Sequence, residues 1–258
     1  MDMMLAAAQN GLATQSFLIT QVADNLANVN TAGYGRRITA ATGGGGTMVR
    51  PPGVVMMGTG LLPSASVPAP VQSGVDVPTF SQGMTGVSSP TALAVAGSGF
   101  FQVQLPSGQL GYTRAGSFRV DANGQLVNPQ GYRLVPAIKV PPGATGLAIA
   151  ANGTVTAQVG GTTTTLGQIT LALFPNDAGL VQQAGGVYQP SANSGAPTVV
   201  VPGTGGSGPL VSGALNASGV SVSSEMVALI QASSAYSLSA KLMTTAEVLD
   251  QATTQMNA

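Results

Sequence analysis

Apolar side chains recur with helical spacing near the start of the chain. Two lines of residues repeat every seven positions: Leu5, Leu12, Ile19 and Leu26, and then Ala8, Gln15, Val22 and Val29. A heptad repeat of this kind is typical of a helix with one apolar seam. The pattern predicts a helix from about Met3 to about Asn28, because the turn-forming run 30–33, Asn-Thr-Ala-Gly, follows it.

The last segment carries a similar repeat. Its members are Val222, Leu229, Tyr236 and Met243, with Met226, Ser233 and Ala240 between them. We predict a second helix from about Val222 to about Thr254, with a serine cap near Ser221. A long helix with an apolar stripe is not stable alone in water, so both helices need partners.

The spacing leaves two arrangements open. The terminal helices pack on each other as an ordinary helical hairpin, or they form a coiled coil whose outer faces also meet neighbouring subunits. For the second case the predicted subunit-interface seam is Leu5, Leu12, Ile19, Val22, Leu26, Val222, Met226, Leu229, Tyr236 and Met243.

The centre of the chain has the pattern of short strands and turns. All seventeen prolines lie between Pro51 and Pro209, which confines strong breakers of regular structure to this part. Two Asn-Gly pairs, at 123–124 and 152–153, stand between apolar runs and predict hairpins. Residues 166–174 predict one further strand, and the glycine-rich runs 39–47 and 201–208 predict flexible connectors.

Together these patterns predict an α+β fold, with terminal helices forming a coiled coil and a central all-β domain of short strands. We divide the chain into an N-terminal helix and turn at 1–37 and an extended linker arm at 38–92. The central β domain follows at 93–209, and the C-terminal helix of the coiled-coil domain occupies 210–258.

Composition removes several classes of function. The chain has no Cys and no His, so it lacks a thiolate, an imidazole base and a histidine metal ligand. Only 6% of residues are charged, with equal numbers of each sign, so no basic patch for nucleic acid is expected. No apolar run is long enough to span a bilayer, and no cleavable signal peptide is expected. We predict a non-enzymatic protein without cofactor, metal or catalytic residues.

Three stretches resemble the flagellar rod and hook proteins. The first, 24–34, holds the motif residues Asn25, Leu26, Ala27, Asn28, Gly33 and Tyr34. The others are 97–103 with 112–118, and 224–232 with Ala235 and Tyr236. Within this group, the length and the run 121–127 are most similar to the distal rod members.

This resemblance implies a structural subunit of the distal rod, which polymerises helically into the drive shaft of the bacterial flagellum. It also implies export through the flagellar type III apparatus and assembly in the basal body across the periplasm. The implied partners are copies of itself and other rod and hook proteins, with no nucleic acid and no membrane insertion. A proximal rod or hook subunit is the alternative within the group. A secreted β-domain binding or adhesion module is the alternative from another class.

Overall fold

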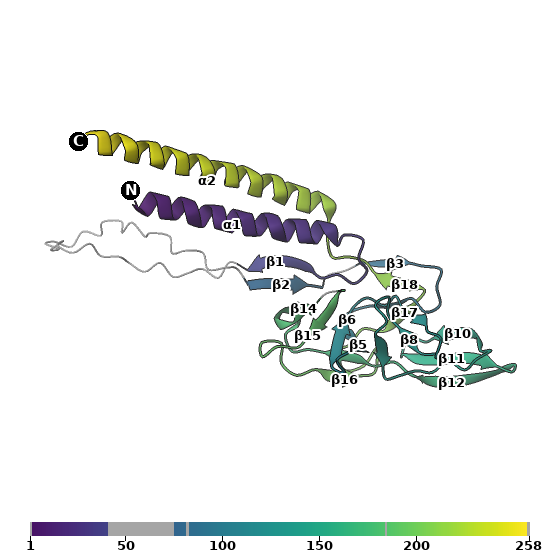
Figure 1. The fold of residues 1–258 in the computed structure, drawn as a ribbon. Helices are drawn as coiled ribbons and strands as arrows, with labels where there is room; N and C mark the ends of the chain where they lie inside the picture. Colours follow the sequence, from purple (N-terminus) through teal and green to yellow (C-terminus); the bar gives the residue numbers. More distant parts are fainter. Residues whose placement is uncertain (1, 41–74, 81–82, 184, 257–258) are drawn as a thin grey trace. The chain divides into compact units, whose positions relative to one another are not determined.

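The computed structural model describes residues 2–40, 75–80, 83–183 and 185–256 (Figure 1). The chain separates into two compact units. The helical unit comprises Met1–Asp24, Thr39–Asp76 and Ser223–Ala258, and the β unit comprises Asn25–Ile38 and Val77–Val222. Residues 41–47 of the predicted connector and most of the predicted arm 38–92 lie outside the described residues, whereas residues 39 and 40 of the connector belong to a strand, β1 (Arg36–Ala40).

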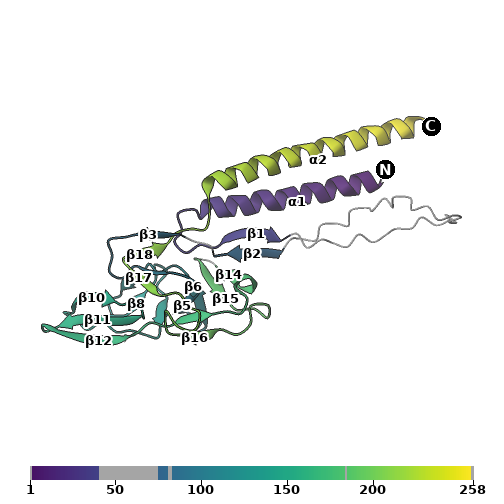
Figure 2. The ribbon, with the colours of Figure 1, turned by 180° about the vertical axis from the view of Figure 1, so that it is seen from behind.

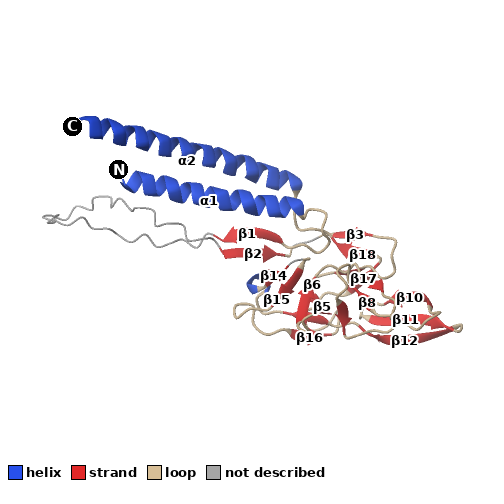
Figure 3. Ribbon diagram, viewed as in Figure 1, coloured by secondary structure: helices blue, strands red, loops and turns tan. Residues whose placement is uncertain are grey.

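Long helix occurs at the two ends of the described chain, and strands fill the part between (Figure 3). Helix α1 covers Asp2–Ala27 and helix α2 covers Val222–Met256, within two residues of the predicted bounds. In both ribbon views the two helices run side by side in opposite directions, with the chain ends at the same end of the pair (Figure 2). The mixed α+β fold expected from the proline distribution is therefore confirmed.

The largest sheet of the β unit has nine strands. Its main path runs in the order β14-β15-β6-β5-β9-β8-β7, and β13 joins β5 to β16. Its strands are β5 (Phe100–Gln104), β6 (Leu110–Thr113), β7 (Arg119–Val120), β8 (Leu126–Val127), β9 (Arg133–Val135), β13 (Leu171–Leu173), β14 (Val181–Gln183), β15 (Val187–Gln189) and β16 (Thr198–Val200). Every pairing in it is antiparallel, as expected for strands joined by short turns.

The other described strands form smaller sheets. A three-stranded sheet has the order β10-β11-β12, and three further pairs are β1-β2, β17-β4 and β18-β3. Their strands are β1 (Arg36–Ala40), β2 (Val75–Thr79), β3 (Met84–Gly86), β4 (Leu93–Val95), β10 (Thr145–Ile149), β11 (Thr154–Val159), β12 (Thr162–Gln168), β17 (Leu210–Ser212) and β18 (Ala214–Asn216). A single-turn 3₁₀ helix, η1, covers Asp177–Gly179.

Both predicted Asn-Gly hairpins are present. Asn123 and Gly124 connect β7 to β8, and Asn152 and Gly153 connect β10 to β11. The Asp121 carboxylate accepts the N–H groups of residues 123 and 125, at 2.9 and 2.7 Å. These hydrogen bonds to the charged form lower the pKa of Asp121, with the Gln125 N–H bond as the largest cause.

Two sequence predictions were wrong. Residues 166–174 are not one strand: β12 ends at Gln168, the Ile169 N–H donates to the Gly153 carbonyl at 2.8 Å, and β13 starts at Leu171 in the other sheet. The run 201–208 is a hydrogen-bonded loop rather than a flexible connector. The Ser207 hydroxyl donates to the carbonyls of Val201 and Thr204, and the Gly208 N–H donates to Ser98.

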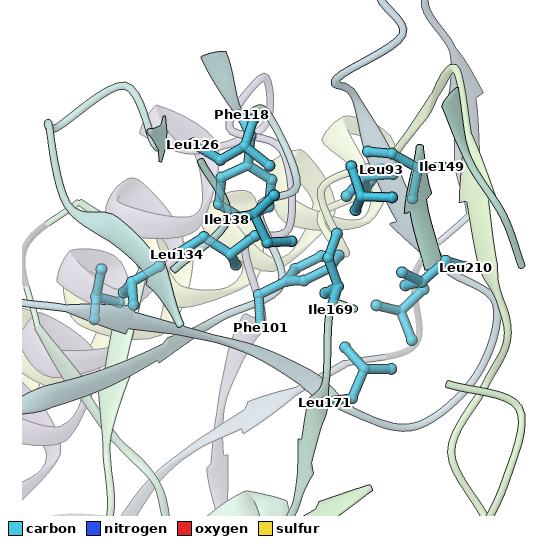
Figure 4. Close-up of a cluster of buried hydrophobic side chains, with 14 residues drawn as sticks. Leu93, Phe101, Phe118, Leu126, Leu134, Ile138, Ile149, Ile169, Leu171 and Leu210 are labelled. Atoms are coloured by element: carbon cyan, nitrogen blue, oxygen red, sulfur yellow. The ribbon is translucent and has the colours of Figure 1, made fainter. Parts of the chain in front are cut away.

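The core of the β unit lies where these sheets meet. The apolar side chains converge from strands of several sheets (Figure 4), including Leu93, Phe101, Phe118, Leu126, Leu134, Ile138, Ile149, Ile169, Leu171 and Leu210. A second, aromatic cluster forms around Phe100 and Tyr188, in which rings pack edge to face. Burial of these side chains holds together strands that are too short to be stable as separate hairpins.

Candidate assembly surfaces

Helix α2 turns a line of mostly small residues toward the interior of the helical unit. The buried positions repeat every seven residues at Glu225, Ala232 and Ala246, with half-buried Ser239 between them. On α1, a Cβ atom added at Gly11 would lie 3.0 Å from the Ser239 Oγ atom. The two helices therefore approach closely where both carry small side chains. This close approach explains why a glycine is tolerated within α1.

A different line of large apolar residues on α2 is exposed. We call it the outer stripe, and its members are 48% to 65% exposed: Val227, Ile230, Leu238, Leu242, Val248 and Leu249. At 3.6 residues per turn, their side chains fall within a sector of roughly 120° around the axis of α2. The centre of this sector lies about 130° around the helix from the buried line of Glu225, Ala232 and Ala246. The only charged residue in that sector is Lys241. Soluble chains rarely gather six exposed large apolar side chains in one sector of a helix unless another molecule covers them.

The residues of the predicted seam divide between these environments. On α1, Val22 is buried, whereas Leu12, Ile19 and Leu26 are half-buried. On α2, Leu229 and Met243 are half-buried, whereas Val222, Met226 and Tyr236 are exposed. Leu5 lies in α1, but its side chain is outside the described set. Within the single chain, each buried position of α2 thus follows a predicted seam position by three residues, as Glu225 follows Val222 and Ala232 follows Leu229.

The family-motif residues form a corner between α1 and β1, residues 25–35, which we call the motif corner. Asn25 is buried, and its amide group pairs with both backbone groups of Arg37: it accepts the N–H and donates to the carbonyl, each at 2.9 Å. The Asn25 Oδ1 atom also accepts the Tyr34 hydroxyl at 3.4 Å. The Asn25 side chain thereby bonds the backbone of Arg37, at the start of β1, as a neighbouring strand would.

The remaining motif residues hold the corner against the rest of the β unit. Gly33 donates its N–H to the Asn216 carbonyl at 2.8 Å, and buried Tyr34 accepts the Gly219 N–H at 3.0 Å. Asn28 accepts the Thr31 hydroxyl at 3.2 Å and stabilises the turn. Leu26 is half-buried and Ala27 is exposed. The motif therefore acts through backbone hydrogen bonds, which its residue types alone did not reveal.

Asn216, which sequence reasoning missed, is the buried partner of this corner. Its side chain accepts the Val95 N–H at 2.9 Å and donates to the Val95 carbonyl at 3.0 Å. The two residues are 121 positions apart, so no local pattern links them. Only its position after a short apolar run, at the end of β18, could have drawn attention to it.

Arg114 is the buried cation of the β unit. It is 5% exposed, and its guanidinium donates to the carbonyls of Phe80 at 3.1 Å and Gly97 at 2.6 Å. The same group lies 5.5 and 5.2 Å from the ring centres of Phe80 and Phe100. Burial lowers the pKa of Arg114, and the negative charge of Asp177 opposes this shift. Burial also raises the pKa of Tyr188, whose hydroxyl accepts the Gly35 N–H at 3.1 Å.

In the described part of the chain, no three Asp, Glu, Cys or His residues come together in a way that would hold a metal ion. None of the described helices has the length and apolar character needed to cross a membrane.

Comparison with known proteins identifies the family. Residues 94–157 match the model of the flagellar hook protein FlgE/F/G D1 domain, and residues 211–256 match that of the flagellar basal body rod FlgEFG protein C-terminal domain. The D1 match covers strands β5 to β10 and the hairpin into β11. The C-terminal match covers α2 with its outer stripe.

Individual relatives agree with the domain matches. The chain is 33% identical to the flagellar basal-body rod protein FlgG of Buchnera aphidicola, over 96% of this chain and 97% of that protein. It is 34% identical to FlgG of Caulobacter vibrioides, over 98% of each chain. The flagellar hook protein FlgE of Brucella abortus is 38% identical over 52% of this chain and 31% of its own length. The chain belongs to the flagellar basal-body rod protein family, in its distal-rod FlgG group, and is a structural subunit of the basal body rather than an enzyme.

Proposed function

We propose that this subunit polymerises helically through the outer stripe of α2 and that the polymer is the drive shaft of the flagellum. The exposed stripe is the observation that carries the proposal, since six large apolar side chains on one helix face water in the single chain. Covering the exposed half of each contributes about 1 kcal/mol at the usual value per area, so roughly 6 kcal/mol is available for each subunit.

The coiled coil belongs to the same proposal. The line of small residues joins α1 to α2 within a subunit, and the outer stripe joins helices of neighbouring subunits. Of the exposed seam residues, Met226 lies next to the stripe on the helix and would be covered with it, whereas Val222 and Tyr236 lie on the opposite side of α2. Contacts between unlike faces that do not close into a ring generate a helical filament, which can transmit torque along its axis.

Location and further partners follow from this role. Membership of the rod family places the subunit in the flagellar basal body. We infer that it is exported through the flagellar type III apparatus and assembles across the periplasm. Its ends would meet other rod and hook proteins. The sparse charge, 6% of residues, supports close packing of copies because it leaves little mutual repulsion.

Replacing two stripe residues together, Ile230→Ser and Leu238→Ser, tests the proposal. Assembly is followed by pelleting and light scattering at rising protein concentration in ammonium sulfate, which strengthens apolar burial. Loss of two anchors is expected to raise the critical concentration at least about tenfold, since each 1.4 kcal/mol is a factor of ten. Circular dichroism checks that the variant keeps its helices.

Val199→Ser is the matched control for this experiment. Val199 is also a large exposed apolar residue, but it lies on edge strand β16 of the β unit. We expect the control to assemble like the unmodified chain. Equal critical concentrations for the double variant and the unmodified chain would show that the stripe is not the polymer interface.

A further inference from the structure

A pocket of about 710 Å³ is lined by residues of the β unit, whereas the outer stripe belongs to the helical unit. It lies between the end of β2, the turn before β5 and the start of η1. Its walls carry apolar, polar and charged side chains, among them Phe80, Phe174, Ser98, Asn176, Arg114 and Asp177. We call it the Arg114 pocket.

One nitrogen of the buried guanidinium on the pocket wall has no hydrogen-bond partner among the described residues. Two of its nitrogen atoms are held by the carbonyls of Phe80 and Gly97. The Arg114 Nε atom is buried and makes no hydrogen bond with any of the described residues. A buried donor without an acceptor costs about 1 to 3 kcal/mol, so an acceptor brought into the pocket would be bound favourably.

Asp177 presents an acceptor to the same pocket. Its side chain is half-buried and takes part in no hydrogen bond or ion pair with the described residues, Arg114 included. It is also the only charged residue between Lys139 and Glu225. The pocket thus carries a free donor and a free acceptor of opposite charge, whose formal charges cancel.

We propose that the Arg114 pocket receives the primary amide of an Asn or Gln side chain from a second copy of this chain. An amide offers its carbonyl oxygen to Arg114 and its NH₂ group to Asp177. A carboxylate would be repelled by Asp177, and an ammonium group by Arg114, so the neutral dipolar group complements the pocket best. The aromatic walls would cover the amide from solvent and strengthen both hydrogen bonds.

The composition of the chain points to a second copy as the donor of that amide. It has eighteen Gln and eleven Asn but only sixteen charged residues, so a neighbouring copy presents amides more often than ions. This partner rests on the proposed polymerisation, whereas the pocket lies in the other unit from the outer stripe. The two contacts can therefore be tested separately.

The test measures the critical concentration for polymerisation of the full chain carrying Asp177→Asn. This change keeps the shape of the side chain but removes its charge, and a charge-assisted hydrogen bond is about twice as strong as a neutral one. We expect the critical concentration to rise about fivefold, which corresponds to about 1 kcal/mol. The same change at the exposed turn residue, Asp121→Asn, is the control and is expected to have no effect on assembly.

The outcomes separate the possible occupants. If a carboxylate occupied the pocket, Asp177→Asn would relieve repulsion and lower the critical concentration. If only water entered it, the critical concentration would not change. Either result overturns the proposal, provided that the variant unfolds in urea at the same midpoint as the unmodified chain. Failure of the unmodified chain to polymerise at all would instead contradict the proposed function, and with it the second copy as partner.

Protection of a single cysteine gives a second readout. The chain has no Cys, so Ala178→Cys introduces one thiol in the lining of the Arg114 pocket. Its reaction with a maleimide is expected to slow at least tenfold in the polymer compared with the monomer. Addition of Asp177→Asn should restore part of the monomer rate at equal polymer mass. An unchanged rate for Ala178→Cys on polymerisation would show that no neighbouring copy enters the pocket.

Discussion

Replacing Asn216 with alanine is expected to lower the free energy of unfolding of the β unit by about 3 kcal/mol. The change leaves the Val95 N–H and carbonyl without their partners, and each unsatisfied buried group costs about 1 to 3 kcal/mol. Water cannot easily replace the amide, because Asn216 is 1% exposed and Val95 is 2% exposed. Val95 lies opposite Leu210 in the β17 pairing, but its own backbone groups bond to Asn216 instead.

Urea unfolding, followed by a spectroscopic signal that reports on the β unit, measures this loss. The midpoint urea concentration should fall while the dependence of the free energy of unfolding on urea concentration stays the same. Asn152→Ala is the matched control, because the exposed Asn152 side chain makes one hydrogen bond, to the Thr154 N–H at 3.1 Å. It should cost less than about 1 kcal/mol. Similar losses for the two variants would mean that the Asn216 pairing with Val95 adds nothing to the fold.

Much of the fold was predictable because it depends on local signals. The absence of proline near both ends separated α1 and α2 from the strands, and the Asn-Gly pairs identified two hairpins. In each case the residues that decide the structure lie within a few positions of one another. The division of 166–174 into two strands was not predictable in this way. It depends on Ile169 bonding to Gly153 and Leu171 pairing with Phe101, which are distant in sequence.

The candidate surfaces were predicted less well, and the physical reason differs for each. On α2, apolar residues occupy most of the circumference, so the heptad of large residues did not identify the buried face. That face is set by small side chains such as Ala232 and Ala246, which allow α1 to approach. The Arg114 pocket joins Arg114, which follows β6, to Asp177 in η1. They are 63 positions apart in the sequence, and only the tertiary structure brings them together.

Replacing Gly33 with alanine is expected to damage the β unit still more. Gly33 has a φ angle of +69°, which costs an alanine about 1 kcal/mol. In addition, the new Cβ atom would lie 2.4 Å from the Arg114 carbonyl carbon and 2.4 Å from the Ala115 nitrogen. Both are backbone atoms of the segment that presents the buried Arg114, so a change of side-chain rotamer cannot relieve the overlap.

Relief would require the motif corner to move away from the rest of the β unit, which would break the hydrogen bond from the Gly33 N–H to Asn216. We therefore expect a loss of at least about 3 kcal/mol for Gly33→Ala, made up of the backbone strain and the lost packing and hydrogen bonding. The urea midpoint of the β unit measures it. Arg114 should become more accessible to guanidinium-modifying reagents if the corner has moved.

Gly108→Ala separates the two causes. Gly108 has a similar φ angle of +80°, but a Cβ atom added there meets nothing within 4 Å. This control carries the backbone strain alone and should cost about 1 kcal/mol. A loss for Gly33→Ala no larger than that of Gly108→Ala would mean that the corner can move at no cost. In that case the motif glycine would serve only as a turn residue, whereas the larger expected loss makes it a contact point between the motif corner and the rest of the β unit.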